Sequence, residues 1–365
     1  MTKDLVKIQD KLAPLASSVL PSLAAIAVGM VVGLFILIIS NPAHAWGGFL
    51  EILFAGSNSL RNMGRVLYFA TPIILTGLSV GFAFKTGLFN IGASGQFIMG
   101  AYCAVLVGVL GTSLGSLHWI VALLAALVGG ALWALVPGLL KAYANVNEVI
   151  SSIMMNYIGM NLVNYLVVLT VFNPTRNESM PVARSAEVPH MGMRTLFSGS
   201  NVNGGILIAV AVVIVMWIIL NKTTFGFELK AVGFNRHASR YAGINEKRSI
   251  VYSMVIAGAL AGLGGGLLYL AGTGKHIEVV DVLAAEGFQG IPVALLGMSN
   301  PIAILFSAIF IAYISVGGNM LQRHGFVPEI INIIIAAIIY CSAFALVIKN
   351  FLEYRRAKAG GGKAA

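Results

Sequence analysis

Residues 221–249 read NKTTFGFELKAVGFNRHASRYAGINEKRS, a polar stretch of nearly thirty residues in a chain that is otherwise almost all apolar. It carries six lysines and arginines against two acids, Glu228 and Glu246. Long apolar segments lie on both sides of it. A basic loop between apolar segments is typical of the cytoplasmic side of a membrane protein. This stretch therefore predicts both the class of the protein and its orientation.

The centre of this stretch predicts a short helix, because Asn235 is a good N-cap and Gly243 a good residue just past a helix end. The helix would run from Arg236 to Ala242. The two alanines would then lie one turn apart, as would the two arginines and the two aromatic residues. The helix would therefore have separate small, basic and aromatic faces. Such a helix can seat in a groove on a partner, and the alternative is a solvated loop that only fixes topology. The candidate contact residues are Asn235, Arg236, Ala238, Arg240, Tyr241, Ala242 and Gly243.

The composition of the chain excludes an ordinary soluble domain. Of 365 residues, 58% are hydrophobic and 10% are charged, whereas soluble domains are about a quarter charged. The net charge of +10 reflects the bias toward cytoplasmic lysine and arginine and contact with anionic lipids, so no nucleic-acid partner is inferred. Cys103 and Cys341 lie in apolar runs, which predicts neither a disulfide framework nor a metal site.

About ten apolar segments are long enough to cross a bilayer if some are short or tilted, so the predicted fold class is an all-α polytopic membrane protein. The first segment is about 20 residues long, which favours an uncleaved span over a signal peptide. With both termini in the cytoplasm, 16 lysines and arginines lie inside and 7 outside. The predicted spans are 19–40, 66–84, 88–110, 117–140, 149–172, 204–221, 250–272, 283–297, 301–317 and 329–348.

The predicted organisation is a cytoplasmic N-terminus (1–18), a transmembrane domain (19–348) and a cytoplasmic tail (349–365). Within the domain, residues 222–249 form the cytoplasmic loop. Residues 173–203 form an external segment, which is an ordered loop or docking surface, with a disordered connector as the alternative. The external segment 41–65 holds Trp46, Phe49 and other apolar residues among Gly, Ser and Asn. It suits a helix lying in the membrane interface.

Two glycine-rich stretches interrupt the apolar segments. The first is TGLFNIGASGQ at 86–96 and the second is EGFQGIP at 286–292. Irregular backbone at membrane depth is tolerated only against protein or a water-filled cavity, so both stretches are predicted to face a pathway. Their position in opposite halves of the chain suggests a weak internal repeat, and helix-packing glycines are the alternative explanation. The candidate pathway residues are Asn90, Ser94, Gln96, Glu286 and Gln289.

Glycines at 258, 262 and 266 recur every four residues in the seventh span, which predicts close approach of another helix. The chain has no GxxxxGK[ST], HExxH or CxxC motif, so neither catalysis nor a cofactor or metal bound by this chain is predicted. Ion-coupled transport usually needs an acid or histidine near the middle of the bilayer. The acids closest to the predicted spans lie near the ends of those spans, which disfavours this mechanism. A secondary carrier remains the alternative from another class.

Three motifs resemble the membrane permease subunits of bacterial ABC importers, in the branch that handles simple sugars, branched-chain amino acids and nucleosides. They are GLFNIGASGQ at 87–96, NEVISSIMMNY at 147–157 and EGFQGIPVALLG at 286–297, which are most similar to the nucleoside members. The resemblance covers roughly residues 65–350 and includes the family's coupling segment in 225–244. One departure is Arg236-His237-Ala238, where sugar permeases of this branch often have Glu-Ala-Ala.

The resemblance implies a pore subunit in the bacterial inner membrane that is worked by a separate ATPase, which binds ATP and magnesium and grips the coupling helix. It also implies a substrate-binding lipoprotein outside and a second, shorter permease, with a homodimer as the alternative. The expected substrate is a nucleoside, and a simple sugar such as ribose is the alternative. Anionic and neutral lipids surround such a subunit.

Overall fold

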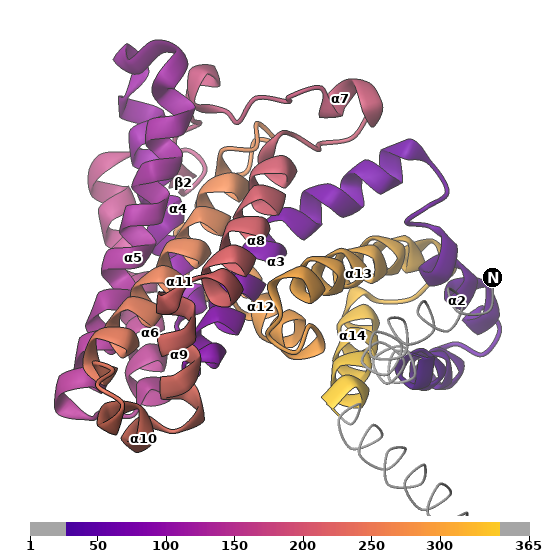
Figure 1. Cartoon of the computed structure of the whole chain (residues 1–365). Coiled ribbons are helices and arrows are strands. Elements are labelled where there is room, and N and C mark those ends of the chain that lie inside the picture. The colour runs from indigo at the N-terminus through magenta and orange to yellow at the C-terminus, as the bar shows by residue number, and fades with distance from the viewer. Residues whose placement is uncertain (1–26, 344–365) are drawn as a thin grey trace, which may run out of the picture. The chain divides into compact units, whose positions relative to one another are not determined.

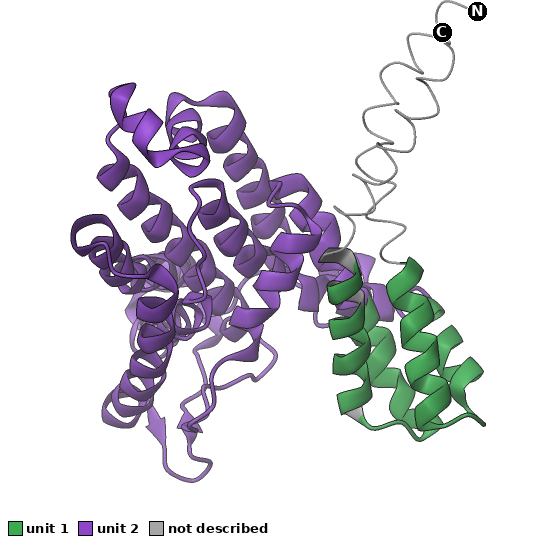
Figure 2. Cartoon of the chain, turned by 90° about the horizontal axis from the view of Figure 1, so that it is seen from below, with its two compact units in different colours: residues 1–55, 314–365 green, residues 56–313 purple. Residues whose placement is uncertain are grey.

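The computed structural model describes residues 27–343, and almost all of its regular structure is helical (Figure 1). The chain divides into two compact units, residues 56–313 and the two ends of the chain, 1–55 with 314–365 (Figure 2). The principal helices are α2 (Ala45–Phe54), α3 (Leu60–Lys85), α4 (Ala93–Leu110), α5 (His118–Ala144), α6 (Glu148–Thr170), α8 (Gly205–Lys222), α9 (Thr224–Phe234), α10 (Arg236–Tyr241), α11 (Glu246–Tyr269), α12 (Ala285–Leu296), α13 (Pro301–Met320) and α14 (Pro328–Ala343).

Helix α11 lies at the centre of the larger unit and packs against α3, α4 and α5. The predicted glycine face allows this packing. A Cβ on Gly262 would stand 2.9 Å from the Cα of Gly130 on α5, and Gly100 on α4 also lies against Gly262. Backbones that approach this closely gain dispersion contacts, which hold helices together where lipid removes the hydrophobic drive between them. The prediction of close helix approach at this face is confirmed.

Within residues 27–343, seven helices are long and apolar enough to cross a membrane: α3, α4, the 112–144 segment that ends with α5, α6, α8, α11 and the 301–324 segment that begins with α13. They match seven of the ten predicted spans. The other three predictions correspond to the helix Ala27–Ser40, to α12 with 12 residues, and to α14. Residues 19–26 and 344–348 lie outside the described residues, as do the predicted N-terminus (1–18) and tail (349–365). The count of ten and the sides of the termini stay predictions.

The predicted external loop is ordered. Strand β1 (Phe172–Asn173) pairs antiparallel with β2 (Glu178–Ser179), and the backbone N–H of Val188 donates to the carbonyl of Leu270 at 2.8 Å. Two short helices follow, η2 (Arg184–Ala186) and α7 (Met193–Leu196). Because these bonds join the loop to the end of α11, the alternative of a disordered connector is wrong. The two short strands are the exception to an all-α fold.

In the smaller unit, α2 packs against the last turn of α13 and the chain that follows it. Gly48 lies against Leu321 and Phe326, and Gly317 lies against the backbone of Ile52. One face of α2 is therefore buried, while Trp46 is 64% exposed. The helix predicted within 41–65 is confirmed, and its location in the membrane interface stays a prediction.

Candidate coupling surface and transport pathway

Helix α10 forms where the sequence predicts it, because its two ends satisfy their own backbone groups. The Oδ1 of Asn235 accepts the N–H of Ala238 at 3.0 Å, and Gly243 takes a φ of +82°, which favours glycine. The helix spans Arg236–Tyr241, one residue shorter than predicted. Short turns fix it between α9 and α11.

Large aromatic side chains project from this end of the unit. Phe234 is 90% exposed and Tyr241 95% exposed, and Phe227 on α9 is 67% exposed. Ala238, Ala242 and Gly243 are exposed beside them. Apolar side chains gathered on a polar surface mark an interaction site. The predicted contact residues include Tyr241 but neither Phe227 nor Phe234, although Phe234 lies in the coupling segment that the family resemblance implies.

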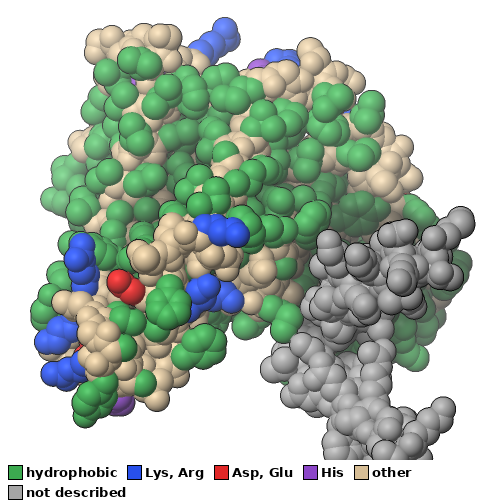
Figure 3. All heavy atoms as spheres, in the orientation of Figure 1, with side chains coloured by type: hydrophobic (Ala, Val, Ile, Leu, Met, Phe, Trp, Pro, Cys, Tyr) green, Lys and Arg blue, Asp and Glu red, His purple; other side chains and the backbone are tan. Residues whose placement is uncertain are grey.

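Basic residues surround these aromatic side chains. Figure 3 shows lysines and arginines gathered over the end of the unit that carries α9 and α10, below a mostly hydrophobic band. A band of this kind suits lipid, and the basic end is the signature of the cytoplasmic side. We call the exposed part of α9, α10 and the turn to α11, residues 227–243, the coupling surface.

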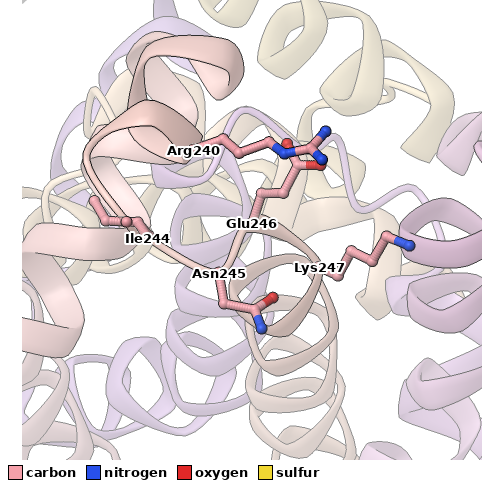
Figure 4. A pocket seen from close by; sticks show the side chains of 6 residues that line it. Arg240, Ile244, Asn245, Glu246 and Lys247 are labelled. Carbon is pink, nitrogen blue, oxygen red and sulfur yellow. The ribbon is translucent and has the colours of Figure 1, made fainter.

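The two arginines of α10 have different surroundings. Nε of Arg236 donates to Oε2 of Glu246 at 2.8 Å, with the side chains 31% and 15% exposed. Arg240 is exposed and borders a hollow together with Gly243, Ile244, Asn245, Glu246 and Lys247. Figure 4 shows these side chains, which come from the end of α10, the turn after it and the first turn of α11. Arg240 is thus available to a partner, whereas Arg236 is held within the chain.

The coupling surface is connected to the interior through the chain between α3 and α4. A Cβ on Gly87 would stand 3.4 Å from the Cα of Gly233 on α9, and Gly87 has a φ of +73°. Leu88 packs in one buried cluster with Val232. The hydroxyl of Thr86 donates to Oγ of Ser253 on α11 at 2.8 Å. A displacement of α9 would therefore act directly on this loop.

Beyond Leu88, the loop is held by side-chain amides. Asn90 and Gln96 exchange two hydrogen bonds, of 2.8 and 3.0 Å, and Asn90 also donates to Ser79 on α3 at 3.0 Å. Asn156 on α6 donates to the carbonyl of Ile91 and accepts the N–H of Gly95. Asn90 and Gln96 are at most 1% exposed. These amides satisfy each other and the loop backbone, as buried polar groups in a membrane protein must.

The two broken stretches lie against each other. The hydroxyl of Ser94, itself fully buried, donates to the carbonyl of Ala284 at 2.8 Å, and the backbone of Gly287 lies against that of Ser94. Glu286 and Gln289, from the same stretch as Gly287, are half-buried and exposed respectively. The predicted pathway set therefore divides into three buried residues that hold the loop and two accessible ones. Its role in transport stays a prediction.

Comparison with known proteins agrees with this geometry. The model of the family "branched-chain amino acid transport system / permease component" matches residues 62–343. The chain belongs to this family. The matched range includes the coupling surface, the loop between α3 and α4, and α12, so every part of the candidate site lies within the part of the chain that the family model matches.

Three relatives resemble this permease over nearly all of its length. The guanosine ABC transporter permease protein NupP of Bacillus subtilis is 38% identical over 341 residues, which are 91% of this chain and 95% of that protein. The nucleoside ABC transporter permease protein NupB of Lactococcus lactis is 35% identical over 345 residues, 93% and 94% of the two chains. The glucose ABC transporter permease protein TsgB13 of Haloferax volcanii is 33% identical over 346 residues, 92% and 88%. No solved structure matches significantly.

Each of the two bacterial strains also has a second similar permease. NupQ and NupC carry the same descriptions as NupP and NupB and are both 27% identical to this chain, over 275 and 271 residues. As a permease component, the chain is a transport subunit and not an enzyme. Within residues 27–343, no three His, Cys, Asp or Glu side chains lie close enough together to hold a metal ion.

Proposed function

We propose that this permease is one pore-forming subunit of an ATP-driven importer for nucleosides. The observation that carries the proposal is its similarity, over more than nine-tenths of its length, to two permeases described as transporting guanosine and nucleosides. The two accessible residues of the candidate pathway, the amide of Gln289 and the acid Glu286, agree with an uncharged, hydroxyl-rich solute.

The energy for transport comes from a separate ATPase that binds ATP and magnesium and docks on the coupling surface. Two features support this assignment. Phe234 and Tyr241 are almost fully exposed, as anchors for a partner's pocket are. The Gly87–Gly233 contact connects the same surface to the loop before α4, so closure of the ATPases can move the interior of the permease.

A second, shorter permease completes the pore, and a lipoprotein delivers the solute from outside. The paired permeases of the two bacterial strains favour two different pore subunits over a homodimer. The complex lies in the bacterial inner membrane with the coupling surface and both termini in the cytoplasm. The concentration of lysine and arginine at that surface supports this orientation (Figure 3).

A simple sugar is the second candidate substrate, because the glucose permease of Haloferax volcanii also matches nearly the whole chain. Proteoliposomes holding the permease with its ATPase, second permease and lipoprotein separate the two. We expect ATP-dependent uptake of labelled guanosine and no uptake of labelled glucose or ribose. Uptake driven by a proton or sodium gradient without nucleotide would instead establish a secondary carrier and refute the proposal.

A further inference from the structure

An ion pair joins the chain after α11 to the first turn of α12. Nζ of Lys275 lies 2.6 Å from Oε1 of Glu286, and the two side chains are 37% and 27% exposed. Nζ of Lys275 also lies 5.6 Å from the centre of the Tyr269 ring, a cation–π contact. The pair is thus fixed in place yet accessible from outside the chain.

The acid of this ion pair lies on a helix that packs against α3 and α4 away from their outer ends. Gly287 packs against the backbone of Ser94, at the start of α4, and the remainder of α4 to Leu110 is about 24 Å long at 1.5 Å per residue. Gly290 packs against Thr76, which is again about 24 Å along α3 from Leu60. The hydrocarbon core is about 30 Å thick. Glu286 therefore lies beside the membrane-spanning helices and far from the outer ends of α3 and α4.

Charged side chains within a membrane domain do not face lipid. They pair with one another and line a water-filled cavity or a protein interface. Gln289 lies one helical turn from Glu286 on the same face of α12 and is also exposed. An amide, a carboxylate and an ammonium group thus share one accessible surface, of the kind that lines a water-filled cavity or a protein interface.

We propose that Lys275, Glu286 and Gln289 form a recognition point in the pathway for the vicinal hydroxyls of the transported solute, an inference that rests on the proposed nucleoside transport. The carboxylate of Glu286 accepts hydrogen bonds from two neighbouring hydroxyls. Lys275 keeps two further N–H donors, and the Gln289 amide offers both a donor and an acceptor. Lys275 and Glu286 neutralise each other, so an uncharged solute meets no net charge.

The test uses the complete transporter in proteoliposomes and compares guanosine with 2′,3′-dideoxyguanosine, which lacks both hydroxyls. The lipoprotein is identical in every sample, so a change in the ratio of the two maximal uptake rates comes from the permease. We expect E286Q to lower the guanosine rate about tenfold and to bring the ratio close to one. An unchanged ratio in E286Q would overturn the proposal.

A second measurement does not require that variants of Lys275 or Glu286 transport the solute. In a chain with C103A and C341A, we expect the cysteine of Q289C to react with a charged, water-soluble thiol reagent and to react more slowly with excess guanosine. Reaction only with a lipid-soluble maleimide would place this face against lipid and overturn the proposal.

A third comparison separates recognition from simple attachment of α12. Replacing an ion pair by apolar residues of similar size is often neutral for stability. We expect K275M with E286L to lose guanosine transport, while the matched replacement R176M with E178L, at the ion pair of the external loop, retains it. Full transport by the first double variant would overturn the recognition point. If wild type carries glucose and not guanosine, the proposed substrate fails, and glucose against its deoxy analogues tests the same residues.

Discussion

The side chains of Arg236 and Glu246 are joined by a 2.8 Å hydrogen bond from Nε to Oε2, which ties the first residue of α10 to the first turn of α11. Nη1 of Arg236 also lies 3.5 Å from Oδ1 of Asn145, just past the end of α5. A helix of six residues has little stability of its own. These contacts hold α10 where its aromatic side chains face a partner.

Reversing the charge at Arg236 should therefore displace α10 and not remove a partner contact. In R236E an attraction becomes a repulsion, at a cost of about 1–2 kcal/mol for a partly exposed pair, or roughly tenfold in the occupancy of the native position. We expect ATP-driven uptake to fall about tenfold and to recover in R236E with E246R. The matched variant R240E lies on the exposed side of α10, and E246R should not rescue it. Rescue of both, or of neither, would contradict the separation of the two arginines.

The parts of the fold that depend on neighbouring residues could be predicted from the sequence. Asn235 and Gly243 cap α10 through bonds within eight residues, and the lengths of the apolar runs locate the spans. The helices against which α12 packs could not be predicted in this way. Its 12 residues resemble a short span, and only the contacts of Gly287 with Ser94 and of Gly290 with Thr76 show where it lies.

Asn90 and Gln96 should behave as structural residues, because each satisfies the other. N90L would leave the Gln96 amide buried without its partner, at a cost of about 1–3 kcal/mol. We expect a lower yield of folded permease and a lower temperature of unfolding in detergent. In the background without native cysteines, N90C and Q96C should resist water-soluble thiol reagents that label Q289C. Labelling of N90C as fast as Q289C would show that the loop opens to the pathway.

The candidate site was only partly predictable, for a physical reason. A polar side chain in an apolar segment can face water or another polar side chain, and the sequence does not distinguish the two. The bonds of Asn90 involve Ser79, and those of the loop backbone involve Asn156, which is distant in sequence. Glu286 and Gln289 have the same local signature, but α12 presents them at the surface.

The close contact of α11 with α5 should not tolerate a side chain at Gly262. A Cβ there would stand 2.9 Å from the Cα of Gly130 and 3.0 Å from its nitrogen, and backbone atoms cannot move aside as side chains do. We expect G262V to force the helices apart and to prevent accumulation of folded permease in the membrane. The control is G47A on α2, where the nearest atom is 3.4 Å from the new Cβ, an ordinary contact. Normal accumulation of G262V would contradict this packing.

Phe234 and Tyr241 should anchor the ATPase. They are 90% and 95% exposed, and burial of a large aromatic side chain in a partner's pocket often contributes 2 kcal/mol or more to binding. We expect F234A and Y241A each to weaken ATPase binding by about thirtyfold and to lower the amount of ATPase that copurifies with the permease.

F306A on α13 is the control, because Phe306 is also exposed, at 66%, but lies on a membrane-spanning helix away from the coupling surface. The membrane insertion and yield of all three variants should match those of the wild type, because none of the three side chains packs in the core. Undiminished copurification in F234A and Y241A would show that the ATPase binds elsewhere. Loss in F306A as well would indicate a general defect of the detergent-solubilised complex and would remove the support for specific anchors.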